Sequence, residues 1–159
     1  MFHMILVLVS IALVAALAVA TLWHGGEAMS AGNIRAAATA TVNQGQQIAV
    51  ATRNFATAKN ARLPTSIAEL VTEGFLGSMP IGDSVFTGGA WYFFTSGNQR
   101  FAAIQIDETT GEVDQFCTQI NVRSSGGNLP VPQPSFSDAQ VFPFFCAVDS
   151  GVLIFFYRM

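Results

Sequence analysis

The stretch that decides the fold is FHMILVLVSIALVAALAVATLW, which spans residues 2–23. Its residues are apolar except for His3, Ser10 and Thr21. It contains neither proline nor glycine, and its many Leu, Ala and Met residues favour helix. A helix of this length extends about 30 Å, which matches the hydrocarbon thickness of a bilayer. The sequence therefore predicts an apolar helix over residues 1–24 that lies in lipid or packs against other protein.

Three interpretations fit this apolar segment. Ala18-Val19-Ala20 is typical of a signal-peptide cleavage site, although no positively charged residue precedes the apolar run. An ordinary membrane anchor satisfies the length and hydropathy, with Trp23 and His24 at the lipid interface. In the third interpretation, copies of the segment pack against one another. The support for this interpretation comes from the pattern of the rest of the chain.

A second helical pattern follows Gly25 and Gly26, over about residues 28–60. Because glycine weakens a helix by about 1 kcal/mol, we expect these two residues to be a flexible point in one long helix. The helix should end before Pro64, since the residue preceding a proline avoids helical angles. Small and apolar residues recur every three or four positions, as on one buried helix face: Ile34, Ala38, Thr41 or Val42, Gly45, Ile48, Thr52 and Phe55.

Beyond the long helix, the spacing of apolar residues changes from a helical period to the alternation of β-strands. A short helix is expected over residues 65–73, where TSIAEL is typical of a capped helix start. The last apolar stretch, residues 152–156, is apolar on both faces, so the long helix should cover one face and loops or a neighbouring subunit the other. Stretches of β propensity separated by turn residues predict an antiparallel sheet over about residues 90–158: Ala90–Thr95, Arg100–Asp107, Glu112–Asn121, Val141–Ala147 and Val152–Arg158.

These patterns together predict an α+β fold. A long N-terminal helix, apolar in its first half, should pack its second half on an antiparallel sheet. We expect two parts, the apolar helix of residues 1–24 and a globular head of residues 25–159, which includes the second half of the long helix.

Composition excludes several classes of function. Charged residues make up 11% of the 159 residues, against about a quarter in an average soluble domain, and the net charge is -3 with no basic run for nucleic acid. His3 and His24 flank the apolar segment, so the head has no histidine for a catalytic triad or a metal site. Glycine motifs that bind phosphate are also missing. We therefore expect a protein that is not an enzyme and holds no cofactor or metal.

Two clusters in the expected sheet region admit a binding interpretation. Asp107, Glu108, Glu112 and Asp114 could offer oxygen ligands to a calcium ion, but a solvated turn explains them as well and the EF-hand spacing is missing. The aromatic residues 91–94 could form a ligand platform. Packing in the core or at an interface explains them better, because aromatic side chains dominate the buried area of small sheets.

Cys117 and Cys146 are the two cysteines of the chain. They form no C-x-x-C motif and have no histidine nearby, which favours a disulfide in an oxidising compartment over a metal site. Two buried free thiols are the alternative. In the loop-entropy model, a bridge that closes a loop of about 30 residues stabilises the fold by roughly 3–4 kcal/mol.

The segment LPTSIAELVTEGFL, residues 63–76, is similar to the P-x-S/T-hydrophobic-x-x-L-V-x-x-G-Y/F-L segment of type IV pilins and of the pseudopilins of type II secretion. These families share an apolar N-terminus, a long helix, an antiparallel sheet and a C-terminal cysteine pair, and the resemblance covers essentially the whole chain. It implies a structural subunit of an extracellular, type IV pilus-like filament. Such a subunit waits in the inner membrane of a bacterium until the assembly machinery adds it to a helical homo-oligomer.

The resemblance also assigns residues to the filament core. Ile5 occupies the position at which the family carries a glutamate, so a pseudopilin or a minor, initiating pilin is the first alternative. A membrane-anchored periplasmic binding domain that does not polymerise is the second. The residues implied to form the core or to lie in the membrane are Phe2, Ile5, Leu6, Leu8, Val9, Leu13, Leu17 and Trp23.

Overall fold

The computed structural model describes most of the chain. It leaves out residues 1, 83–86, 108–111 and 128–133, and the side chains of residues 2–10, 16–30, 87 and 88. The chain divides into two units, Met1–Ile34 and Arg35–Met159, and the second unit holds the whole sheet.

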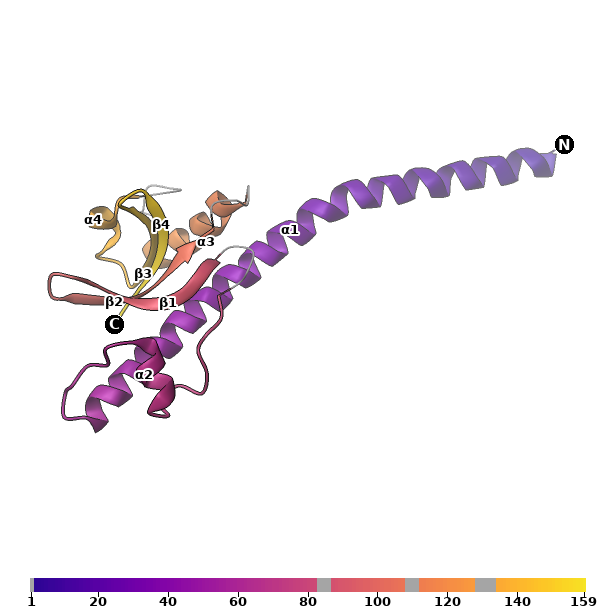
Figure 1. Ribbon diagram of the computed structural model, residues 1–159. Coiled ribbons are helices and arrows are strands. Elements are labelled where there is room, and N and C mark those ends of the chain that lie inside the picture. Colours follow the sequence, from indigo (N-terminus) through magenta and orange to yellow (C-terminus); the bar gives the residue numbers. More distant parts are fainter. Residues whose placement is uncertain (1, 83–86, 108–111, 128–133) are drawn as a thin grey trace. The chain divides into compact units, whose positions relative to one another are not determined.

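Helix α1 comprises Phe2–Ala58 (Figure 1). It carries the predicted buried stripe. Of the alternatives Thr41 and Val42, Thr41 is the buried one. The stripe is therefore confirmed at the spacing that the sequence predicted, and its buried members are Ile34, Ala38, Thr41, Gly45, Ile48, Thr52 and Phe55.

The end of α1 has a different cause from the one that the sequence suggested. The helix stops at Ala58, well before Pro64, because Asn60 and Ala61 adopt left-handed backbone angles with φ of 53° and 66°. The Ala61 amide donates to the carbonyl of Ala56 at 2.8 Å, which satisfies one of the last helical carbonyls. Proline is thus not what ends the helix.

Helix α2, Ile67–Thr72, confirms the predicted short helix but begins two residues later than expected. Ser66 is the N-cap, and its hydroxyl accepts a hydrogen bond from the Glu69 amide at 3.2 Å. Glu69 therefore occupies the third helical position, where a capping box places its acidic residue. Its carboxylate accepts from the amide of Thr65 at 2.6 Å and also pairs with Arg62.

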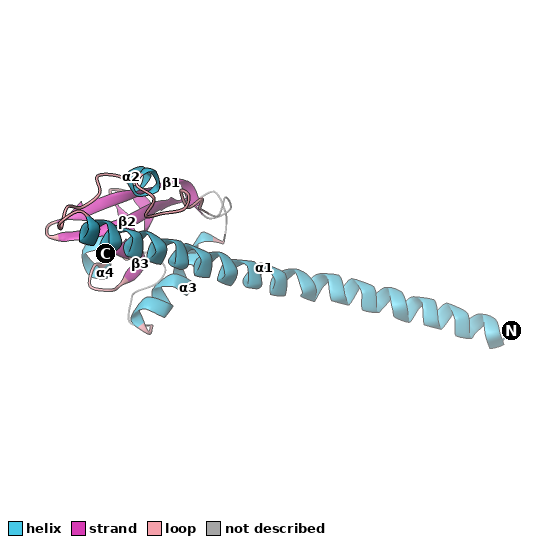
Figure 2. Cartoon of the chain, turned by 90° about the horizontal axis from the view of Figure 1, so that it is seen from below, coloured by secondary structure: helices cyan, strands magenta, loops and turns pink. Residues whose placement is uncertain are grey.

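Four strands form one antiparallel sheet in the order β1-β2-β4-β3 (Figures 1 and 2). Two hairpins, β1 with β2 and β3 with β4, join where β2 pairs with β4. The antiparallel sheet is thus confirmed, and β4 has the predicted bounds. The strands are β1 (Thr87–Ser96), β2 (Gln99–Ile106), β3 (Phe144–Asp149) and β4 (Val152–Arg158).

Strand β1 begins before the predicted Ala90. Its pairing with β2 shifts register between Gly88 and Tyr92, so the chain bulges there, and Gly89 has a φ of 91°. A left-handed angle of this kind suits glycine, which lacks a Cβ. Gly88 and Gly89, which precede the predicted start at Ala90, therefore lie inside the strand.

The predicted strand Glu112–Asn121 is wrong, because this stretch forms helix α3, Val113–Ser125. Its buried side chains, Val113, Phe116, Cys117, Ile120 and Asn121, follow a helical spacing. The predicted strand Val141–Ala147 also begins too early. A short helix, α4 (Phe136–Ala139), precedes it, and β3 starts only at Phe144.

Residues Leu153–Phe156 of β4 are all buried, which confirms that both faces of this strand are covered. On one face an aromatic cluster joins the sheet to α4, with the rings of Phe136 and Phe156 centred 4.9 Å apart. On the other face, the Phe155 ring contacts Trp91 at 5.9 Å, and Cys146 of the adjacent strand is bonded to α3. The aromatic cluster comprises Phe94, Phe101, Phe136, Phe142, Phe145 and Phe156 with Ala103, Ala139, Ala147 and Ile154.

We predict that Gly45→Ala destabilises the fold by about 1–3 kcal/mol, the usual range for overpacking a core. A Cβ at Gly45 would lie 2.8 Å from the Cβ and two ring carbons of Tyr157 in β4. Gly32→Ala in the same helix is the control, because its Cβ would meet no atom within 4 Å. Chemical unfolding of the full chain in detergent measures both. Equal or greater stability of Gly45→Ala would contradict this packing.

We also predict that Ala61→Gly stabilises the head by about 0.5–1 kcal/mol. Ala61 has a φ of 66°, and this left-handed angle strains an alanine because of its Cβ. Ala40→Gly, at an exposed interior position of α1, is the matched control and should lose about 1 kcal/mol. The same unfolding measurement decides, and a loss of stability in both variants would refute the argument.

Candidate functional site

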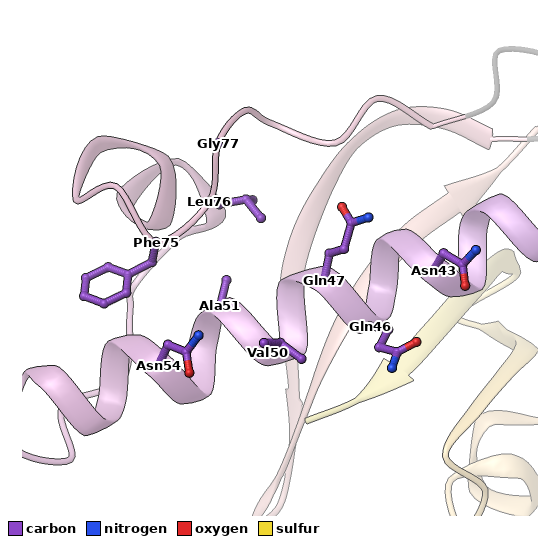
Figure 3. A pocket seen from close by; sticks show the side chains of 9 residues that line it. All are labelled: Asn43, Gln46, Gln47, Val50, Ala51, Asn54, Phe75, Leu76 and Gly77. Carbon is purple, nitrogen blue, oxygen red and sulfur yellow. The ribbon is translucent and has the colours of Figure 1, made fainter.

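A groove runs along the head between α1 and the loop that follows α2 (Figure 3). Its volume of about 500 Å³ falls in the range of small-ligand sites. One wall is a single face of α1, with side chains at helical spacing, and the other wall is the loop. The lining residues are Asn43, Gln46, Gln47, Val50, Ala51 and Asn54 from α1 and Phe75, Leu76 and Gly77 from the loop.

The loop wall is positioned by the C-terminal end of α2. The amides of Phe75 and Leu76 donate to the Leu70 carbonyl at 2.9 and 3.0 Å, across the left-handed Gly74. The Phe75 ring packs edge-on against Phe55 of α1, with ring centres 5.3 Å apart. Leu76 points from the loop toward α1 (Figure 3). These contacts attach the loop to the helix and hold the groove open between them.

The lining of the groove is uncharged. Charged pairs occur in the sequence between the two lining segments, where Lys59 pairs with Glu73 at 2.7 Å and Arg62 pairs with Glu69. The hydrogen bond and the charge of Lys59 lower the pKa of Glu73. The small stabilisation from this exposed pair is therefore present above the ordinary carboxyl pKa and is lost on acidification below it.

The second feature of the head is the disulfide between Cys117 in α3 and Cys146 in β3, with Cα atoms 5.5 Å apart. The predicted pairing is thus present. Beside it, the buried Asn121 side chain forms two hydrogen bonds with the backbone of Cys146. Its Nδ2 donates to the Cys146 carbonyl at 3.2 Å, and its Oδ1 accepts from the Cys146 amide at 2.8 Å.

These contacts cover the outer edge of β3, which is an edge strand of the sheet. Two residues after Cys146 in the same strand, the Val148 amide donates to the Pro134 carbonyl at 3.0 Å. An edge strand with unpaired amides and carbonyls is a template for pairing with another chain. Asn121 and Pro134 take those positions, so this edge offers few free backbone groups.

Of the predicted filament-core residues, Leu13 has a described side chain, and it is 62% exposed. Its neighbours Ile11 and Val14 are 61% and 66% exposed. Gly25 and Gly26 lie within α1. No helix offers a membrane-spanning apolar stretch among the residues that the structure describes in full. The side chains of Phe2, Ile5, Leu6, Leu8, Val9, Leu17 and Trp23 lie outside that description.

Three of the aromatic residues 91–94 are buried or partly buried, as expected, and Tyr92 is 39% exposed. Trp91 is buried against Phe155, and its Nε1 donates to Gln44 at 3.2 Å. Phe94 belongs to the aromatic cluster on the opposite face. Phe93 lies 4.0 Å below the Arg100 guanidinium, a cation–π contact.

Two pKa shifts accompany this packing. Burial raises the pKa of Tyr92, and the nearby charge of Asp149 raises it further. Burial also lowers the pKa of Arg100. Of the acidic residues near the third expected strand, Glu108 lies outside the described residues, and the described part of the chain holds no group of three metal-ligating side chains.

Sequence reasoning missed the groove and Asn121. The groove residues repeat at helical spacing, but any exposed helix face opposite a buried stripe does the same. The sequence predicts a strand at Asn121, so its position beside Cys146 could not be anticipated.

Comparison of the chain with protein-family models, with curated proteins and with solved structures finds no match.

We predict that Asn121→Leu destabilises the head by about 2–4 kcal/mol, because it leaves two buried backbone groups of Cys146 without partners. Leucine fills a similar space without hydrogen bonds. Gln115→Ala, at an exposed position of the same helix, should stay within about 0.5 kcal/mol of the native chain. Chemical unfolding and hydrogen exchange at the Cys146 amide measure the effect. Unchanged protection of that amide in Asn121→Leu would contradict the assignment.

Proposed function

We propose that this chain is the structural subunit of a type IV pilus-like filament and that its apolar N-terminal helix joins the copies. The observation that carries the proposal is the apolar run of residues 2–23. In its described part, Ile11, Leu13 and Val14 each expose more than half of their surface. Contiguous exposed aliphatic side chains are typical of a surface that meets lipid or other protein.

The energetics of this segment suit both a membrane-stored and an assembled state. Removing about twenty apolar side chains from water at roughly 1.5–3 kcal/mol each stabilises either state by tens of kcal/mol. The difference between lipid and a bundle of similar helices is far smaller, because lipid tails are as apolar as leucine. An assembly machine could therefore move a subunit from the membrane into a filament.

The head supports the proposal in a second way. It carries a disulfide between Cys117 and Cys146, a bond that persists in oxidising compartments outside the cytoplasm. Its antiparallel sheet, packed on the second half of α1, has the order of elements that the pilin resemblance implies. Gly25 and Gly26 would then be the point at which α1 bends or unwinds as subunits pack.

A minor, initiating pilin or a pseudopilin is the second candidate. Ile5 favours it, because the family's glutamate at this position is thought to pair with the N-terminal amine of a neighbour during assembly. Abundance distinguishes the two candidates, since a major subunit dominates sheared surface fibres and an initiating subunit does not. A membrane-anchored domain that never polymerises would give no fibres at all.

The test is electron microscopy of sheared surface material from cells that make the protein, with mass spectrometry of the N-terminus. We expect fibres that contain this chain as their main component. Leu13→Gln should remove the fibres, because it places a polar group in the packed segment of every copy. Val122→Gln, at a 45% exposed position of α3, is the matched control and should leave them intact.

Two results would overturn the proposal. Full-length protein that is monodisperse in detergent, from cells without fibres, would leave a tethered domain. Fibres that persist at normal yield in Leu13→Gln would show that the apolar segment is not the joining surface. The thermal unfolding midpoint of the head should be the same in both variants, which separates loss of assembly from loss of folding.

A further inference from the structure

We propose that the groove between α1 and the loop after α2 binds a neutral glycan. All of its lining residues belong to the unit of residues 35–159, so the inference is independent of filament assembly. Four carboxamide side chains line it, those of Asn43, Gln46, Gln47 and Asn54, and the lining includes no charged residue.

The four carboxamides are available to a ligand. They are exposed or border solvent, and within the described part of the chain no hydrogen bond occupies their side-chain amides. Gln44 on the same helix provides the contrast. Its Nε2 donates to the Ile81 carbonyl at 2.8 Å and its Oε1 accepts from Trp91 at 3.2 Å, so its amide has a structural role.

The chemistry of the lining selects the class of ligand. A carboxamide offers two donors and an acceptor, and a sugar hydroxyl likewise donates and accepts. A row of amides therefore matches a row of hydroxyl groups. An ionic ligand would lose hydration without gaining an opposite charge, which is unfavourable. Val50, which is 48% exposed, and Leu76 add an apolar surface for the C–H face of a sugar ring.

The walls of the groove are less suited to a peptide. An extended peptide adds to a free strand edge, whereas one wall here is α1, whose backbone groups bond within the helix. A helical peptide needs deep apolar pockets for its anchor residues. The apolar lining consists of Val50, Ala51, Phe75 and Leu76, and the Phe75 ring is engaged with Phe55.

Gly77 provides a variant that fills the groove without straining the backbone. A Cβ at this position meets no atom within 4 Å, and its φ lies outside the left-handed region. A large side chain at this lining position is therefore tolerated by the fold, and we expect it to compete with a ligand for the groove. Gly77→Trp should block binding while the disulfide and the unfolding midpoint stay unchanged.

The test uses the full chain in a polyoxyethylene detergent, whose head group carries no sugar. An array of neutral oligosaccharides of hexoses and N-acetylhexosamines, with their sialylated and sulfated counterparts, identifies the probe, and calorimetry gives its affinity. We expect neutral glycans to bind and acidic groups not to improve binding. Combining Gln47→Ala with Asn54→Ala should weaken binding at least about tenfold, since each lost hydrogen bond contributes to affinity. Gln115→Ala is the control and should bind like the native chain.

Three results would overturn the inference. One is the failure of every neutral oligosaccharide to bind at millimolar concentration. Another is native affinity in the folded Gly77→Trp or double alanine variants, which would place the ligand elsewhere. The third is displacement of the glycan by an uncharged extended peptide, which would make the groove a peptide site. Because these measurements use dispersed subunits, they stand apart from the presence or absence of fibres.

Discussion

The architecture of the head depends on strand β4, whose side chains are apolar on both faces. Leu153 and Phe155 point to one side of the sheet and Ile154 and Phe156 to the other, and all four are buried. Both faces must therefore be removed from water. Helices α1 and α3 cover one face, and α4 with its aromatic neighbours covers the other. Gly45 permits α1 to approach β4 so closely that Tyr157 occupies the space of a missing Cβ.

The spacing of apolar residues explains which parts of the fold the sequence could predict. The buried stripe of α1 from Ala38 to Phe55 repeats at a helical period, and β4 is a continuous apolar run. Both patterns can therefore be recognised in the sequence. Helix α3 was missed, since its Val, Ile, Thr and Phe residues have β propensity and tertiary packing overrode that preference. The groove needed the loop after α2 to come against α1, and no local pattern reports such a long-range contact.

The two functional proposals use different parts of the molecule and different physics. Filament assembly would rely on the hydrophobic effect between aliphatic side chains, which is non-directional and allows many packing partners. Glycan binding would rely on directed hydrogen bonds from amides held on one rigid helix face. In a subunit of this kind, the apolar helix joins the copies and the groove binds the ligand. Either property could therefore change in evolution without disturbing the other.

The paired hydrogen bonds between Asn121 and Cys146 have a consequence for any crowded array of heads. Tethering many copies at short spacing raises their effective concentration to the millimolar range. At such concentrations a bare strand border would nucleate continuous cross-strand growth and convert an ordered polymer into amyloid-like material. At the border formed by β3, the Asn121 side chain and the Pro134 carbonyl already occupy backbone groups, so this border is a poor template for such growth.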